Sequence, residues 1–114
     1  MEFEEVVRAR RMVRNFQPTP VPDETIMHIL DLARRGPSAG FAVMLLLLAV
    51  VNEGLAAGFA GMWDLDSCRE LLGIPEEVTP VGVIPIGYAA PDKRSPSLKR
   101  GRHPQTDVIH REQW

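Results

Sequence analysis

The sequence contains a single cysteine, Cys68, among its 114 residues. One thiol excludes an intramolecular disulfide and any metal site built from paired cysteines, and it is typical of a protein from a reducing compartment. The N-terminus is acidic at Glu2, Glu4 and Glu5, where a secretory signal would be basic and then apolar. We therefore expect no export signal and a cytoplasmic location.

Long apolar runs are also scarce. The longest, Phe41 to Val51, has eleven residues without a polar group, against the roughly 20 needed to cross a bilayer. Its leucine-rich composition favours a helix, and a helix that is apolar all round is expected to be buried on all sides. The run therefore predicts a central core helix, with membrane insertion as a weaker alternative.

Aromatic residues make up only 6% of the chain and are not interleaved with the arginines. Of 13 lysines and arginines, six fall in residues 1–40 and six in residues 91–114, and the net charge is -2. This pattern makes nucleic-acid binding the weakest interpretation, since such proteins are usually basic overall and present stacking aromatics. If the two basic ends meet in the fold, they could enclose one anion.

The densest basic motif runs from Arg10 to Arg14 and places three arginines within five residues. A short amphipathic helix is predicted to end at about Arg11, within the motif, and residues 13–16 are predicted to be extended. Guanidinium groups present planar donors that match phosphate oxygens. Spacing alone leaves two readings open, a phosphate site and a solvated basic face.

Further along the chain, the patterns predict three more elements. Apolar residues at helical spacing indicate a helix over 24–35, capped by Gly36 and followed by a Pro-Ser-Ala-Gly loop. A second helix is expected over 64–72, with Asp64 as its N-cap, and β-branched residues predict a strand over 81–88. His28 and Cys68 have no partner at ligand spacing, and we interpret both as structural.

Taken together, five segments resemble, in order, the nitroreductase family of FMN-dependent NAD(P)H oxidoreductases. They are Arg10–Phe16, Val21–Glu24, Gly36–Gly40, Arg69–Pro75 and Pro85–Tyr88. The resemblance implies an α+β fold, with an antiparallel or mixed sheet flanked by helices, shortened and completed by dimerisation.

The central part of the family domain is absent from this chain. Phe41 stands where the family has an asparagine, and the sequence then continues directly into the apolar run. The sequence leaves open whether the protein is truly shortened or the sequence is incomplete. We expect one shortened domain, with N-terminal helices and the flavin-phosphate motif in 1–40, core elements in 41–90, and a basic C-terminal arm in 91–114.

The resemblance also implies a set of FMN-binding residues. The motif around Arg10 and two arginines of the arm would hold the phosphate and ribityl chain, the Pro-Ser-Ala loop would line the flavin, and a Gly-Met pair would meet its ring. The candidates are Arg10, Arg11, Met12, Arg14, Pro37, Ser38, Ala39, Gly61, Met62, Arg100 and Arg102. No catalytic side chain and no metal ligand is expected, because the flavin carries the chemistry.

The implied activity is hydride transfer from NAD(P)H through FMN to a nitroaromatic, a quinone or a related acceptor. The alternative is a catalytically silent relative that binds flavin or only dimerises. A homodimer is expected in both cases, because a chain without the central block would expose apolar surface. In the family, the arm ends in a strand that often joins the partner subunit's sheet, and the same is expected here.

Overall fold

The computed structural model describes residues 1–93 and 96–114 of the chain. Arg94, part of the basic arm noted above, lies outside the described residues. The helices are α1 (Phe3–Ala9), α2 (Asp23–Ala33), α3 (Ala39–Asn52), α4 (Leu65–Leu72), α5 (Ser97–Arg100) and α6 (Gln105–Val108); the strands are β1 (Ala56–Ala57), β2 (Ala60–Gly61), β3 (Gly82–Val83) and β4 (Ile86–Gly87).

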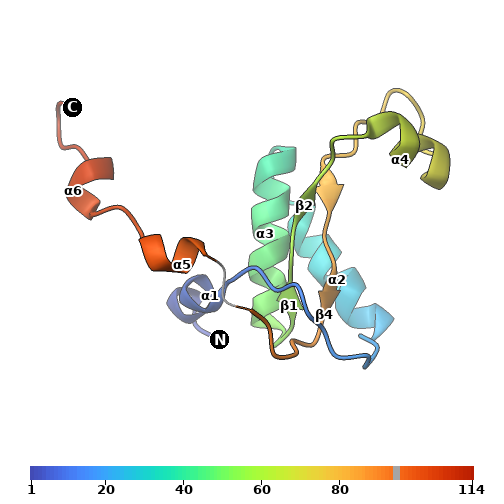
Figure 1. Cartoon of the computed structure of the whole chain (residues 1–114), viewed down its shortest axis with the longest axis horizontal. Coiled ribbons are helices and arrows are strands. Elements are labelled where there is room, and N and C mark those ends of the chain that lie inside the picture. Colours follow the sequence, from blue (N-terminus) through green and yellow to red (C-terminus); the bar gives the residue numbers. More distant parts are fainter. Residues whose placement is uncertain (94–95) are drawn as a thin grey trace.

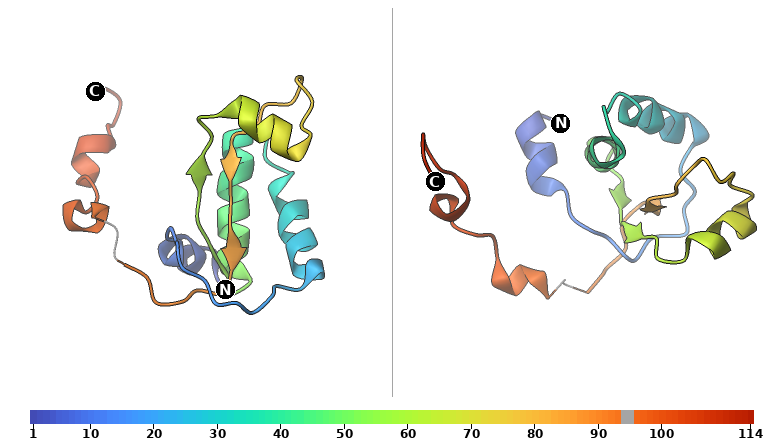
Figure 2. Two further views of the ribbon diagram at one scale, coloured as in Figure 1. Left: turned by 45° about the vertical axis from the view of Figure 1, so that its right-hand side comes forward. Right: turned by 90° about the horizontal axis from the view of Figure 1, so that it is seen from above.

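Helices α2 and α3 form an antiparallel hairpin, and the strands run along one face of it (Figures 1 and 2). β1 pairs antiparallel with β4, and β2 pairs antiparallel with β3. The segment after α1 adds a parallel bridge from Met12 to Ala57 and an antiparallel bridge from Phe16 to Ala89. The predicted α+β class is thus confirmed, with small antiparallel sheets and one parallel contact.

The core lies between the α2–α3 hairpin and the strands. Its buried cluster comes from α2, α3 and the segment around β1, and consists of Ile29, Leu47, Ala49, Val50, Leu55 and Ala57. Val13, in the extended segment after α1, is 1% exposed and extends the buried set towards the arginine motif. The backbone around the arginines is therefore anchored to the core.

The turn between α2 and α3 is tight. A Cβ added to Gly36 would lie 2.6 Å from the backbone nitrogen of Ala42. Ser38 is the N-cap of α3, and its hydroxyl accepts a hydrogen bond from the backbone N–H of Phe41. Gly36 is needed here for close backbone approach, whereas the sequence predicted a helix cap; the C-cap of α2 is Arg34.

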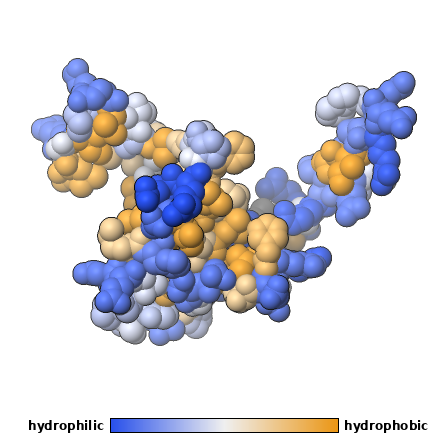
Figure 3. All heavy atoms as spheres, turned by 180° about the vertical axis from the view of Figure 1, so that it is seen from behind, coloured by the Kyte–Doolittle hydropathy of each residue, from blue (hydrophilic) through white to orange (hydrophobic). Residues whose placement is uncertain are grey.

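The expectation that the apolar helix is buried on all sides is wrong for the single chain. α3 is confirmed as a helix, but Phe41, Met44 and Leu45 are exposed. The reason is that α1, α2 and β1 cover only part of its circumference. Apolar side chains consequently gather at the surface of the body, as the space-filling view shows (Figure 3).

The strand predicted over residues 81–88 is interrupted. β3 and β4 are separated by Ile84 and Pro85, and the Pro85 carbonyl accepts a hydrogen bond from the Gly58 N–H at 3.2 Å. Proline has no N–H for a ladder, so it sits where the pairing breaks. Helix α4 is confirmed at both ends. The side chain of its N-cap, Asp64, accepts a hydrogen bond from the Ser67 N–H, and its C-cap, Gly73, adopts a left-handed φ of 66°.

The C-terminal arm extends away from the body (Figure 1) and all its described residues from 98 to 114 are exposed. The closing strand expected from the resemblance does not form within the described part of this single chain; α6 occupies residues 105–108 instead. An isolated arm has no sheet edge to join, which is the physical reason. His110 and Trp114 stack with ring centroids 4.3 Å apart.

The chain is less compact than its length predicts. Its radius of gyration is 16.6 Å, against about 13 Å for a compact domain of 114 residues. Its accessible surface is 9434 Å², against about 6,200 Å² for a compact 12.7 kDa monomer.

In the described part of the chain, no helix combines the length and apolar character needed to cross a bilayer.

Candidate functional site

The arginine motif occupies the junction between α1 and an extended segment that is held on both sides. The Val13 N–H donates to the Ala57 carbonyl at 3.0 Å, and the Gln17 N–H donates to the Tyr88 carbonyl at 2.8 Å. The Gln17 side chain also donates to the Ala89 carbonyl at 2.9 Å. The segment therefore lies between β1 and the chain that follows β4, with the start of the C-terminal arm beside it.

A cavity of about 640 Å³ opens at this junction, and we call it the basic cleft. Both ends of the chain contribute to its walls, which consist of Arg10, Arg11, Met12, Arg14, Ala90, Pro91, Asp92, Lys93, Leu98 and Arg102. Five of these residues carry a positive charge and one carries a negative charge. The basic cleft thus brings together residues from the two basic ends of the sequence, 1–40 and 91–114.

The guanidinium groups of the motif are available to a ligand. Ion pairs in the described residues involve other arginines, such as Arg8 with Glu4 at 2.9 Å and Arg34 with Asp31 at 2.7 Å. Within that same part of the chain, the side chains of Arg10, Arg11 and Arg14 make no ion pair. Free guanidinium donors around one cavity are the arrangement that binds a phosphate group.

Asp92 is the one carboxylate of the basic cleft. It accepts a hydrogen bond from the backbone N–H of Arg14 at 2.7 Å, and this bond is the main reason that its pKa lies below the usual value. The N–H of Lys93 and the charges of Arg14 and Arg11 lower the pKa further, whereas partial burial opposes the shift. Asp92 is therefore ionised at neutral pH and neutralises part of the charge in the cleft.

A second cavity of about 400 Å³ adjoins the basic cleft and shares Met12 and Arg14 with it. Its other walls come from the extended segment and from the chain between β1 and β2, and they are Val13, Phe16, Gly58, Phe59, Ala60 and Pro85. Gly58 is required for close packing, since a Cβ there would lie 2.6 Å from the Val13 carbonyl oxygen. The two cavities together lead from the arginines to β2.

The remaining predicted site residues lie elsewhere. Gly61 pairs with Gly82 in the β2–β3 ladder, Met62 follows it, and Pro37 and Ser38 precede α3. β2 and the start of α3 lie towards the same end of the molecule, away from α1 (Figure 2). Arg100 lines a hollow within the arm, with Arg102 and His103, and is not part of the basic cleft.

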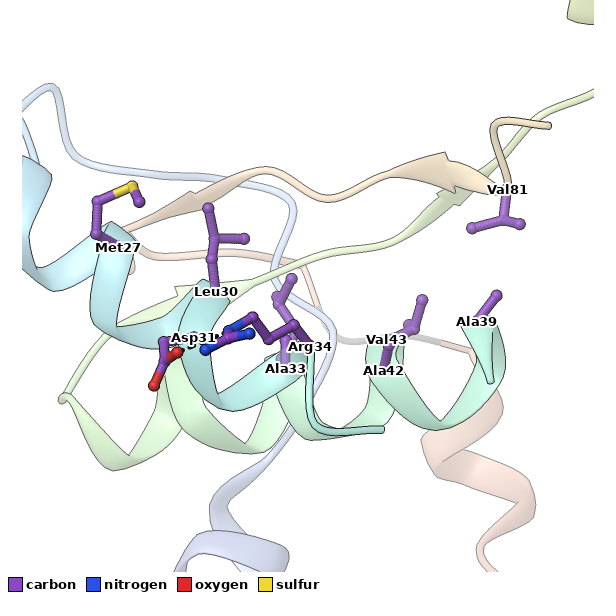
Figure 4. Close-up of a pocket in the computed structure, with 10 residues that line it drawn as sticks. Met27, Leu30, Asp31, Ala33, Arg34, Ala39, Ala42, Val43 and Val81 are labelled. Atoms are coloured by element: carbon purple, nitrogen blue, oxygen red, sulfur yellow. Dashed lines mark hydrogen bonds and ion pairs between the residues drawn. The ribbon is translucent and has the colours of Figure 1, made fainter. Parts of the chain in front are cut away.

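Ala39 lines a further hollow of about 580 Å³ between α2 and α3, which we call the apolar groove. Met27, Leu30 and Ala33 from α2 face Ala42 and Val43 from α3, and Val81 lies across the opening (Figure 4). Arg34 reaches back to Asp31 at the rim, and the guanidinium hydrogen bonds of Arg34 and Arg35 lower the pKa of that carboxyl. The groove thus has an apolar floor and a neutralised rim.

Sequence reasoning missed several residues that line the basic cleft and the cavity beside it. Asp92, Lys93 and Leu98 were not among the candidates, nor were Gly58 and Phe59. One signal for Asp92 was present, because it is the only acidic residue between Glu77 and Asp107, within an otherwise basic stretch. Lys93 belongs to the basic C-terminal end, which was expected to contribute if the two ends meet. Leu98, Gly58 and Phe59 carry no signal in the sequence, since only the packing of β1 and the arm brings them to the arginines.

Comparison with known proteins agrees with this architecture. The model of the nitroreductase family matches residues 7–42 and 38–88 in two pieces. The break falls at the α2–α3 turn, where the central part of the family domain was expected to be missing. A protein of Methanothermobacter thermautotrophicus, named "Putative NADH dehydrogenase/NAD(P)H nitroreductase", is 28% identical over 174 positions. That alignment covers all of this chain and 88% of the relative, and exceeds the 114 residues of the chain by 60 positions.

Solved structures show the same fold. A nitroreductase family protein from Clostridium difficile 630 matches with a TM-score of 0.83 at 18% identity, covering 100% of both chains. An FMN-dependent nitroreductase from Clostridium difficile R20291 matches with a TM-score of 0.76 at 15% identity, covering 96% of this chain and 98% of the other. From the family model and these folds, the chain belongs to the nitroreductase family, with the central part of the family domain absent.

Proposed function

We propose that the protein is an FMN-dependent oxidoreductase that transfers a hydride from NAD(P)H through the flavin to a nitroaromatic, a quinone or a related acceptor. The observation that carries the proposal is the basic cleft, where five cationic side chains surround one cavity. Family membership supplies the reaction class, and a relative of the same fold is named an FMN-dependent nitroreductase.

The residues present fit the phosphate end of FMN. Arg10, Arg11 and Arg14 offer unpaired donors in the described structure, and Lys93 and Arg102 face them from the arm. A phosphate monoester carries close to two negative charges at neutral pH, which would offset about half of the excess of cations over Asp92 in the cleft. These residues are therefore proposed to hold the phosphate.

The opposite end of the site fits the flavin ring less completely. The second cavity leads from Met12 and Arg14 to Ala60, and Gly61 in β2 exposes its backbone to open space. The wall of this cavity follows the chain from Gly58 to Ala60, between β1 and β2, and Gly61 comes directly after it. We propose that β2 and the residues before α3 contact the ring.

Bound FMN would supply the hydride chemistry, as an acceptor of electrons from NAD(P)H and a donor to the second substrate. The chain's own contribution is binding and electrostatics. Its guanidinium groups fix the phosphate, and the exposed backbone at Gly61 leaves one side of the site open to substrates. No side chain is assigned a proton-transfer role.

We further propose that the protein works as a homodimer. The accessible surface exceeds that of a compact monomer by about 3,200 Å² per chain, or about 6,400 Å² for two chains, the size of a large obligate homodimer interface. A cavity of about 960 Å³ beside α1 and α3 is lined by apolar residues and by charged ones. The apolar residues are Phe3, Val7, Met44 and Leu48, and the charged residues are Glu4, Arg8, Arg10 and Arg102. A second chain that covers this face would bury the excess accessible surface.

A second function has its own supporting observation. The relative's alignment exceeds this chain by 60 positions, and the two pieces of the family match meet at residues 38–42, beside the apolar groove, where the central block of the family domain is absent. A chain without this block lacks part of the wall around its cofactor. The alternative is therefore a catalytically silent relative that binds flavin or only dimerises.

The visible absorption spectrum of the purified protein separates the two functions. A flavin band that bleaches when NADPH or NADH is added without oxygen supports the oxidoreductase. A flavin band that persists under both reductants supports the silent relative. A protein that remains colourless after incubation with FMN refutes the cofactor proposal.

A further inference from the structure

We propose that Asp92 is a positioning residue of the basic cleft, whose carboxylate holds the C-terminal arm against the arginine motif so that cations from both chain ends face one anion. The inference rests on the proposed function of the cleft as a phosphate site. It goes beyond that function because it assigns the assembly of the cleft to an acidic residue that would itself repel a phosphate.

Both oxygens of the Asp92 carboxylate accept hydrogen bonds from backbone N–H groups, one in the arginine segment and one in the arm. Oδ2 accepts from the Arg14 N–H at 2.7 Å, and Oδ1 accepts from the Lys93 N–H at 2.8 Å. A carboxylate has acceptor sites on two oxygens and can serve both donors at once. Asp92 therefore connects the arginine segment directly to the first cation of the arm.

Among the described residues, Asp92 is also the last that hydrogen-bonds the body before the arm leaves it. Just before it, the Asn15 side chain donates to the Pro91 carbonyl at 2.7 Å, and the Ala90 N–H donates to the Asn15 carbonyl at 3.1 Å. Among the described residues from 96 onward, the backbone hydrogen bonds are local to the arm. The placement of Leu98 and Arg102 in the cleft thus depends on where Asp92 holds the chain.

A carboxylate in an anion site has an opposing effect, because it repels the ligand. The charged groups around Asp92 are Arg14 and Arg11 from the extended segment and Lys93 from the arm. The side chain remains accessible to solvent, and repulsion between exposed charges is screened at physiological salt. Holding Lys93 and Arg102 in place is therefore expected to outweigh the repulsion.

The test compares Asp92→Ala and Asp92→Asn with the wild-type protein, with Asp107→Ala as a matched control further along the arm. FMN affinity is measured by quenching of flavin fluorescence, and inorganic pyrophosphate affinity by calorimetry. Asp92→Ala is expected to weaken both by about tenfold or more, the effect of removing a hydrogen bond to a charged group. Asp92→Asn keeps one acceptor oxygen and should recover part of the loss, and Asp107→Ala should bind as wild type.

Amide hydrogen exchange provides a readout that needs no ligand. Exchange at the Arg14 amide should accelerate in Asp92→Ala, while the core amide of Val50 stays protected, which also confirms that the variant folds. Tighter anion binding by Asp92→Asn would show that the carboxylate acts as a competitor and would overturn the proposal, as would unchanged affinity in Asp92→Ala. If wild-type protein binds neither FMN nor pyrophosphate but the Arg14 amide responds, the phosphate function fails while the positioning of the arm stands.

Discussion

Gly36 and Ala42 are in backbone contact across the turn that joins α2 to α3. A Cβ at position 36 would approach the Ala42 nitrogen to 2.6 Å and its Cα to 2.9 Å, distances at which the backbone must shift. Position 40, four residues later and inside α3, has nothing within 4 Å of an added Cβ. The two glycines therefore form a matched pair for mutation.

The Gly36→Ala variant should lower the free energy of unfolding by about 1–3 kcal/mol, the usual cost of forcing atoms into a packed site. Gly40→Ala should raise it by about 0.5–1 kcal/mol, because alanine is the better helix former. Urea unfolding followed by circular dichroism measures both. Equal effects of the two substitutions would show that the turn is not as tight as described.

Removing guanidinium groups from the basic cleft should abolish FMN retention. The double variant Arg10→Ala with Arg14→Ala removes two sets of donors from the cavity walls. Each hydrogen bond to a charged group contributes about 1.5–3 kcal/mol, or roughly tenfold to a hundredfold in affinity. Flavin content after gel filtration is the measurement. Arg34→Ala, which removes an arginine paired with Asp31, is the control and should retain FMN. Unchanged flavin content in the double variant would contradict the phosphate site.

The exposed apolar face of α1 and α3 should hold two chains together. Sedimentation equilibrium at micromolar concentration is expected to give twice the chain mass of 12.7 kDa. Met44→Glu should dissociate the dimer, because it places a charge beside the apolar Phe3, Val7 and Leu48 of that face. Leu71→Glu on α4, at a residue 83% exposed, is the control and should remain dimeric. A folded, stable wild-type monomer would refute the dimer.

The N-cap of α4 should weaken in acid. Asp64 accepts hydrogen bonds from the backbone N–H and the hydroxyl of Ser67, and these hold its pKa below the usual 3.8. A depressed pKa stabilises the folded state fully above the unfolded value, and that stabilisation is lost as the pH falls through the folded pKa. The Ser67 amide chemical shift should therefore titrate below about pH 4.

Asp64→Asn separates charge from capping in this prediction. Asparagine is an equally good N-cap but does not titrate, so the Ser67 amide shift should stay flat through the same pH range. A titration that persists in the variant would assign the effect to another group. Circular dichroism of the variant at neutral pH should match that of the wild type.

The elements that depend on local patterns were predictable from the sequence. Helical spacing placed α2, and the Asp64 and Gly73 signals placed both ends of α4. The arginine motif was recognised because guanidinium groups at close spacing match phosphate chemistry. In each of these cases the information lies within a few residues of the element it describes.

The features that were missed depend on contacts between distant segments. Phe41 and Met44 are exposed because the rest of the chain covers only part of α3. The composition of the helix does not show how much of it will be covered. The roles of Asp92 and Lys93 follow from the return of the chain to the arginines. Arg100 lies two residues before Arg102, and the sequence alone does not show which of the two lines the basic cleft.

The assembly of the basic cleft from both chain ends has a consequence for biosynthesis. Arg14 and Asp92 are separated by 78 positions, so the cleft cannot form on the ribosome until the chain has emerged as far as Arg102. Contacts between such distant residues form late and slowly during folding, because a long loop must close first. An anion that binds only the completed cleft would then favour the finished fold over its precursors by mass action. Supply of the ligand during expression would in that case raise the yield of native protein.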